Sequence, residues 1–226
     1  MSNLRRLILL KLTIENFINK EFIINITMIL TNNKLVRKAS KLESKRLFLR
    51  PFVLKDSKLL VESRWLNRRT KKPLKTIEQA KDYIKNHILA QEQGYYLAVF
   101  LKKENILLGY VDLDHVDWYN DKIGEIGYSF LEEHRGKGYA TEAAACFVDY
   151  LFRKVKFYKA TADTDPGNFA SQKVLYKLNF KLEGIFRDKY YNKKTQKWVD
   201  EYNWGILRKN WLLKHKKPLF KIKRTT

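Results

Sequence analysis

The feature that most constrains this chain is a turn with two glycines, residues 135–140, that follows a predicted strand and precedes a predicted helix. A turn of this kind leaves backbone N–H groups unpaired at the helix N-terminus, where the helix dipole adds partial positive charge. Gly136 and Gly138 carry no side chain, so a bulky anion can approach the backbone closely. The segment therefore predicts a phosphate-binding site.

The spacing of this turn separates it from the commoner phosphate loops. The chain lacks G-x-x-x-x-G-K-[ST] and has no G-x-G-x-x-G after the first strand of a βαβ unit. Arg135, Gly138 and Ala140 instead form R-x-x-G-x-A, which resembles the coenzyme A pyrophosphate loop of the GNAT N-acetyltransferases, Q/R-x-x-G-x-G/A. Taken alone, the same letters also describe a basic turn with two glycines. The rest of the chain decides between the two interpretations.

Further motifs follow in the order and spacing of one GNAT branch. Residues 168–171 fit N-x-x-S, residues 175–184 fit L-x-K-L-G-F-x-x-E-G with one departure, and residues 198–200 fit a W-x-D strand. The segment 43–51 matches a first strand that reads E-T-x-R-L-x-L-R-P. This order resembles the RimJ/RimL-type ribosomal-protein N-terminal acetyltransferases, and the resemblance runs from about residue 43 to 211.

Hydrophobic periodicity and turn residues give a matching series of elements. The predicted strands are 47–52, 95–101, 106–115, 123–130, 158–162, 180–188 and 198–207. The predicted helices are 54–66, 76–93, 140–154 and 168–178. Strands first, then strand and helix in alternation, predict an α/β domain with a mixed sheet and helices on both faces. The GNAT resemblance adds a mostly antiparallel sheet with a splayed parallel strand pair at the acetyl-CoA site.

The resemblance also assigns the residues that bind acetyl-CoA. The loop backbone would hold the pyrophosphate, and the strand 125–129 would bind the pantetheine arm edge-on. The residues expected to contact the cofactor are Ile126, Gly127, Tyr128, Arg135, Gly136, Lys137, Gly138, Tyr139, Ala140, Thr141, Asn168 and Ser171.

Two of these assignments have a structural alternative. Gly127 suits a bulge that splays its strand from the parallel neighbour, but close packing would select glycine equally well. Asn168 precedes a predicted helix and is therefore equally expected as its N-cap. Both roles of Asn168 are compatible with each other.

For catalysis the residues favour direct transfer in a ternary complex. Cys146 is the only cysteine and lies in an apolar helix, so we expect a core residue and not a nucleophile. We expect Glu125 to act as the general base, directly or through water, and Asp112, Asp114 and His115 on the preceding strand are weaker candidates. A surface ion pair is the alternative role for Glu125.

The general acid has no obvious residue. Many GNAT enzymes place a tyrosine seven residues after the motif asparagine, and this chain has Leu175 there, as is usual in the RimJ/RimL branch. Tyr176 is one residue further, about 100° around the helix, so we expect it to point away from the sulfur. Asn179 replaces the motif glycine, and asparagine tolerates the left-handed backbone of a tight turn.

Charge divides the 226 residues into three parts. The formal net charge is +22, and both ends are rich in lysine and arginine. We expect a basic N-terminal extension over 1–42, an acetyltransferase domain over 43–212 and a basic C-terminal tail over 213–226. Such tails favour RNA, the ribosome or an acidic membrane surface, although a lysine-biased composition explains the charge equally well. The extension is either a disordered arm or a spurious addition before a start at Met28.

The sequence as a whole predicts a cytoplasmic N-acetyltransferase with acetyl-CoA as co-substrate, no metal site and no transmembrane segment. Its expected acceptor is the α-amino group of a protein N-terminus, plausibly a ribosomal one. Two alternatives stay open: acetylation of a small amine such as an antibiotic or polyamine, and an RNA- or ribosome-binding protein with a vestigial coenzyme A site. The small amine ranks lower because the sequence clusters few acids beyond Asp112, Asp114 and Asp117.

Overall fold

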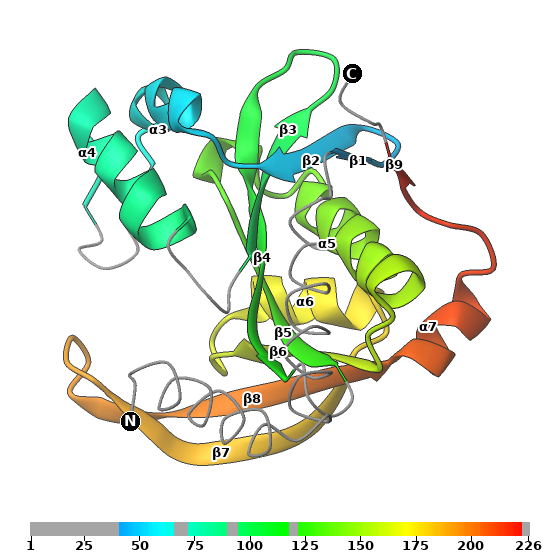
Figure 1. Cartoon of the computed structure of the whole chain (residues 1–226). Coiled ribbons are helices and arrows are strands. Elements are labelled where there is room, and N and C mark those ends of the chain that lie inside the picture. The colour runs from blue at the N-terminus through cyan, green and yellow to red at the C-terminus, as the bar shows by residue number, and fades with distance from the viewer. Residues whose placement is uncertain (1–40, 66–71, 90–94, 118–121, 223–226) are drawn as a thin grey trace, which may run out of the picture.

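The computed structural model describes residues 41–65, 72–89, 95–117 and 122–222, and all structural statements concern these ranges. They hold a single sheet in the order β7-β8-β6-β5-β4-β3-β2-β1-β9 (Figure 1). The strands are β1 (Leu42–Glu43), β2 (Leu47–Pro51), β3 (Tyr95–Leu101), β4 (Leu107–Asp117), β5 (Ile123–Phe130), β6 (Lys159–Thr164), β7 (Lys181–Asn192), β8 (Lys197–Leu207) and β9 (Lys221–Ile222). The α-helices are α3 (Ser57–Glu62), α4 (Ile77–Tyr83), α5 (Tyr139–Tyr150), α6 (Phe169–Lys177) and α7 (Arg208–Lys214).

Every pair of neighbouring strands is antiparallel except one. β5 and β6 run parallel and pair only from Ile123↔Lys159 to Glu125↔Thr161, although both strands continue beyond these residues. The expected mixed, mostly antiparallel sheet with a splayed parallel pair is therefore confirmed. β8 lies beside β6 and β4 lies beside β5, so further strands of the sheet flank the place where β5 and β6 diverge.

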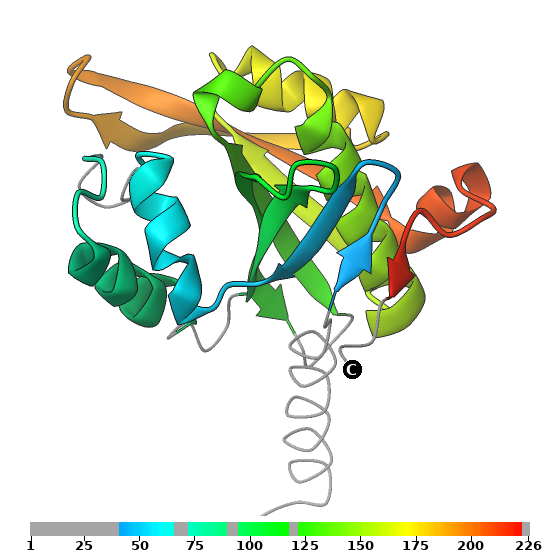
Figure 2. The ribbon, with the colours of Figure 1, turned by 90° about the horizontal axis from the view of Figure 1, so that it is seen from above.

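Side chains that alternate along the strands build a core on each face of the sheet. In β2, Leu47 and Leu49 join the core under α5, α6 and α7, whereas Phe48 joins the core under α3 and α4. β3 repeats the pattern: Leu97 and Val99 face the first core, and Ala98 between them faces the second. Period-two alternation is what places helices on both faces, as Figures 1 and 2 show.

The helices are shorter than the sequence predicts or change their winding. α3 ends at Glu62, and Arg64 then takes a positive φ of 50°, so the helix stops before residue 66. α4 and α5 continue as π-helical turns, Ile84–Leu89 and Leu151–Val155. Residues 90–93 of the second predicted helix lie outside the described residues. None of the described helices is long and apolar enough to cross a bilayer.

The domain extends past residue 212, where the sequence places the start of a free tail. Strand β9 pairs with β1, and the Phe220 side chain is buried. The fully buried Asp149 of α5 ties this segment down: it accepts hydrogen bonds from Trp211 Nε1 (2.7 Å) and from the Leu219 N–H (2.7 Å). Residues 213–222 are therefore part of the fold, and the tail boundary at 212 was wrong.

We expect Asp149→Ala to destabilise the domain by about 3 kcal/mol, because the change leaves buried donors and the Arg153 guanidinium without their acceptor. Urea unfolding of the variant measures this loss. Glu104→Ala, at an exposed turn, is the matched control and should change stability by less than about 0.5 kcal/mol. Equal stability of both variants would show that Asp149 does not anchor the C-terminal segment.

Candidate active site

The predicted phosphate loop lies at the N-terminus of α5, where β5 ends. Gly136 and Gly138 have φ values of +76° and +79°, in the left-handed region that glycine adopts without strain. Gly138 is the N-cap of α5, and no side chain caps this end of the helix. A Cβ added at Gly136 would meet no atom within 4 Å, so the space in front of the loop is open. The loop therefore has the form of an anion site on a helix N-terminus.

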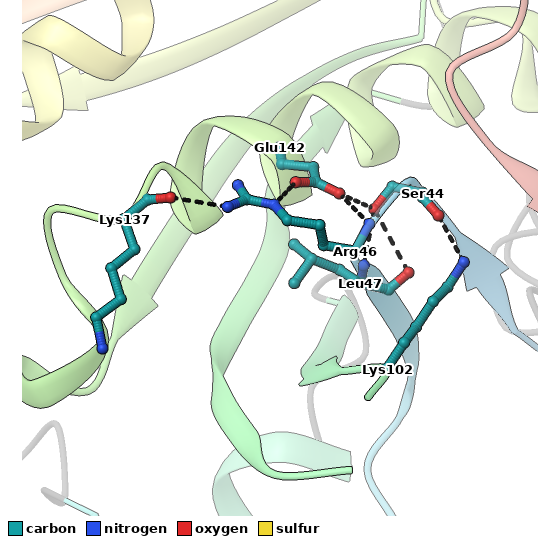
Figure 3. A network of polar contacts seen from close by, with 6 residues as sticks. All are labelled: Ser44, Arg46, Leu47, Lys102, Lys137 and Glu142. Carbon is teal, nitrogen blue, oxygen red and sulfur yellow. Dashed lines mark hydrogen bonds and ion pairs between the residues drawn. The ribbon is translucent and has the colours of Figure 1, made fainter. Parts of the chain in front are cut away.

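A network of polar contacts fastens this loop to the turn between β1 and β2 (Figure 3). Arg46 binds the Glu142 carboxylate through its backbone N–H (2.7 Å) and its Nε (2.6 Å), and Ser44 Oγ binds the same carboxylate at 2.7 Å. The Nη1 of Arg46 donates to the Lys137 carbonyl at 3.1 Å. Burial alone would raise the pKa of Glu142, but the hydrogen bonds from Arg46 and Ser44 outweigh it and lower that pKa.

Arg46 thus holds the phosphate loop in place and also brings a cation to it. A Cβ at Gly138 would lie 3.5 Å from Arg46 Nη2, and the guanidinium stacks over the Tyr139 ring at 4.6 Å. Sequence reasoning missed Arg46, Ser44 and Glu142 as members of the site. For Ser44 and Arg46 the only signal was the match of residues 43–51 to a family strand, which does not show what the side chains contact, and Glu142 had none beyond its place after the loop.

The other basic residues of the loop bind protein backbone. Arg135 Nε donates to the Phe130 carbonyl at 3.0 Å, and Lys137 Nζ donates to the Glu133 carbonyl at 3.1 Å. Arg135 therefore fixes the loop to the end of β5. A direct role of these two side chains toward phosphate stays a prediction.

Gly127 lies in β5 just beyond the last residue that pairs with β6. Its Cβ would come within 2.5 Å of Asp112 Oδ1 on β4, so the close approach of the buried Asp112 requires glycine here. Of the two roles left open for Gly127, the structure supports close packing: Gly127 pairs regularly with Asp112, and the register of β4 and β5 shifts between Asp114 and Asp117 instead. The strands diverge because the β6 pairing stops at Glu125.

Tyr128 connects β5 to α6 across this opening. Its hydroxyl lies 2.8 Å from Ser171 Oγ, and burial raises the pKa of Tyr128 to about 12. Asn168 caps α6, because its Oδ1 accepts a hydrogen bond from the Ser171 N–H at 3.2 Å. The capping role of Asn168 is thus confirmed, and its role toward a cofactor stays a prediction. The structure brings Tyr128, Asn168 and Ser171 together, as expected.

Glu125 occupies the last paired position before β5 and β6 diverge. Burial and the neighbouring Asp163 raise the pKa of Glu125 to about 7. Asp163 lies two residues beyond Thr161, the β6 partner of Glu125, and therefore on the same face of the sheet. Burial together with Glu201 likewise raises the pKa of Asp163, so both carboxyl groups are less acidic than usual.

Other ionisable groups surround this carboxyl pair. On β4, Asp114 is the cross-strand partner of Glu125, and His115 Nδ1 lies 3.6 Å from Glu125 Oε2. On the hairpin of β7 and β8, Glu201 pairs with Lys189 at 3.2 Å. The sequence identified Glu125 and Asp114 but missed Asp163 and Glu201, because strands distant along the chain bring these residues together.

The remaining candidates lie outside this group. Leu175 is fully buried, so the usual tyrosine position supplies no acid. Tyr176 is 62 % exposed and packs edge-on against Trp204, with ring centroids 4.9 Å apart. Cys146 is buried, which raises the pKa of its thiol well above the ordinary range and leaves it unreactive. Asn179 has the left-handed φ of 67° that its motif position requires.

Comparison with known proteins identifies the class of enzyme. Residues 46–181 match the model of the acetyltransferase (GNAT) domain, so the chain belongs to the GNAT N-acetyltransferase family. It is 29 % identical to the uncharacterized N-acetyltransferase p20 of Bacillus licheniformis, over 75 % of this chain and 97 % of that protein. The crystal structure of a GNAT-family acetyltransferase from Bacillus anthracis superposes with a TM-score of 0.62 at 26 % identity, covering 75 % of this chain and 99 % of that one.

A ribosomal enzyme is a more distant relative. The ribosomal-protein-serine acetyltransferase of Escherichia coli is 23 % identical over 49 % of this chain and 61 % of that protein. The family is thus established, and the RimJ/RimL branch is supported only by distant similarity.

We expect Gly138→Val to lower the affinity for coenzyme A at least about tenfold, because valine is strained at a positive φ and crowds Arg46. Isothermal titration with coenzyme A measures the change. Gly184→Val is the matched control, since Gly184 has no positive φ and open space around its Cβ position. Unchanged affinity in a folded Gly138→Val protein would contradict the loop assignment.

Proposed function

We propose that this enzyme transfers an acetyl group from acetyl-CoA to the α-amino group of a protein N-terminus, by direct transfer in a ternary complex. The observation that carries the proposal is the carboxyl pair of Glu125 and Asp163, which lies where β5 and β6 diverge. The GNAT family implies acetyl-CoA as the donor. The acceptor is the part of the proposal that goes beyond the family.

The residues present fit the donor. The loop at Gly136 and Gly138 offers open space, an uncapped helix N-terminus and the Arg46 guanidinium to a pyrophosphate. Beyond Glu125, the edge of β5 that faces β6 has no ladder partner, so its backbone groups can bind the pantetheine arm and polarise a carbonyl. Bound there, the co-substrate supplies a thioester-activated acetyl group.

The acceptor amine must lose a proton for transfer to occur. Its nitrogen attacks the acetyl carbonyl, the new C–N bond forms, and the C–S bond breaks so that coenzyme A leaves as the thiolate. The amine proton passes to the Glu125 carboxylate, directly or through water. Asp163 is a positioning residue, because burial raises the pKa of Glu125 and the negative charge of the neighbouring Asp163 raises it further, to about 7. No covalent enzyme intermediate is needed, which agrees with the buried, unreactive Cys146.

The pKa of the base favours an α-amine over other amines. An α-amino group has a pKa of about 8, whereas a lysine-type amine has one of about 10.4. A carboxylate with a pKa of about 7 is well matched to the first and poorly matched to the second. The distant similarity to a ribosomal-protein-serine acetyltransferase agrees with an N-terminal acceptor.

A small polycationic amine is the second candidate. The sequence made this candidate less favoured because it shows few clustered acidic residues. The fold, however, brings Asp163 and Glu201 beside Glu125 and Asp114. This acidic group would attract a cation of any size. The mismatch of amine and base pKa values is therefore the remaining argument against this candidate.

We expect kcat to rise with pH and to level off above about 7, because Glu125 must be ionised to accept the proton. Asp163→Asn removes a negative neighbour that raises the pKa of Glu125, so the midpoint should move to lower pH. Glu125→Gln should lower kcat by about 10²–10⁴-fold and leave coenzyme A affinity unchanged.

Steady-state rates from pH 5.5 to 9, with Glu104→Gln as control, measure these effects. A normal rate in Glu125→Gln would assign the proton transfer to another group, with Asp114 the next to test.

We expect a peptide with a free α-amine to be acetylated at pH 7 with a kcat/KM at least about tenfold above that of an N-blocked peptide with one lysine, and above that of spermidine. The advantage should shrink at pH 9, where more of the stronger bases are unprotonated. Mass spectrometry locates the acetyl group. Faster acetylation of spermidine at pH 7 would favour the second candidate.

A further inference from the structure

A second concave region lies at the other end of α5 from the phosphate loop. The π-helical turn Leu151–Val155, α7 and the segment before β9 line a solvent-open hollow of about 480 Å³, which we call the basic hollow. Gly138 and Lys154 are 16 positions apart, which at about 1.5 Å per residue separates the two ends by about 24 Å. The residues that line the hollow are Arg153, Lys154, Lys156, Arg208, Leu212, Pro218, Phe220 and Ile222.

The positive charge of the hollow is largely uncompensated. Arg153 is paired with the buried Asp149 at 2.8 Å and donates to the carbonyls of His215 and Lys217. Within the described ranges, Lys154, Lys156 and Arg208 have no ion pair. These three cations come from two separate elements, the end of the α5 extension and the start of α7.

Arg208 is a cation of the hollow whose charge no described residue offsets. Its Nε is buried, and among the described residues it has no hydrogen-bond partner. Because nearly all buried donors are satisfied, this guanidinium is unusual within the fold. The helix dipole accounts for Lys154 and Lys156 near a helix C-terminus, but it does not account for Arg208, which begins α7.

Part of the wall of the hollow is apolar. Leu212, Pro218 and Ile222 contribute to it, and Ile222 is 43 % exposed. A hollow lined by both cations and apolar groups suits an anion that carries a flat or apolar body, and the volume falls in the range of small-molecule sites. A terminal phosphate with up to two negative charges, or successive phosphates of an RNA strand, match three cations better than a single carboxylate does.

We propose that the basic hollow binds the phosphate of a nucleotide, either free or within an RNA strand. The phosphate lies against Lys154, Lys156 and Arg208, and the base packs toward the apolar wall. This site is separate from the acetyl-CoA loop and does not depend on the proposed acceptor. A nucleotide in an RNA strand here would dock the enzyme while its acetyl-CoA site stays open.

Binding is measured with saturating coenzyme A present, so that the loop at Gly138 is already occupied. ADP is titrated by calorimetry and a fluorescent uridine octanucleotide by anisotropy. The double variant Lys154→Gln with Lys156→Gln removes two exposed cations of the hollow, and Lys193→Gln with Lys194→Gln is the control of equal charge at the β7–β8 turn. Thermal unfolding confirms that each variant is folded.

We expect saturable binding that weakens at least tenfold in the Lys154/Lys156 variant and stays unchanged in the control. For the octanucleotide, the slope of log K against log salt should fall by about 1.4 when two phosphate contacts are lost. Arg208→Gln should weaken binding as well. The ligand that binds more tightly identifies a free nucleotide or an RNA strand as the source. Absence of saturable binding, or equal losses in the variant and its control, would overturn the proposal.

Discussion

The short pairing of β5 with β6 is the constraint on which the site depends. Because the ladder ends at Glu125↔Thr161, one edge of β5 loses its partner while β4 still supports the other edge. Glu125, at the last paired position, and Asp163 lie where the two strands diverge, and the pKa of each carboxyl group is raised. An unpaired backbone edge and a perturbed carboxyl pair thus lie at one interruption of the sheet.

Neighbouring charges and hydrogen bonds shift the pKa of one carboxyl group at each end of β5: Glu142 at the loop and Glu125 where the strands diverge. At the loop, Arg46 offsets the negative charge of Glu142 and fixes the Lys137 carbonyl, so a carboxylate near the helix N-terminus does not repel a phosphate. Where the strands diverge, burial and Asp163 work in the opposite direction and weaken the acidity of Glu125. One carboxyl group is held ionised and the other is kept close to neutrality, because the first has cationic and hydroxyl donors and the second has a like-charged neighbour.

The sequence predicted the elements that local patterns define. Alternation predicted the bounds of β3 and β5, and the glycines predicted the turn that begins α5, because period and turn chemistry are properties of adjacent residues. It could not find the contact of Arg46 with Glu142 or of Glu125 with Asp163, since these residues meet only when distant strands pair. The boundary at residue 212 was wrong for the same reason: a lysine-rich segment reads as a tail, and only its contacts with Asp149 and β1 show that it is folded.

We propose that burial and Asp163 tune the pKa of Glu125 so that its carboxylate accepts a proton near neutral pH. A carbon-13 NMR titration of the Glu125 carboxyl group, assigned by its loss in Glu125→Gln and repeated in Asp163→Asn, measures this pKa directly. We expect a midpoint at about 7 in the unaltered enzyme and a lower midpoint in the Asp163 variant. A midpoint near the ordinary glutamate value of about 4.3 in both proteins would contradict it.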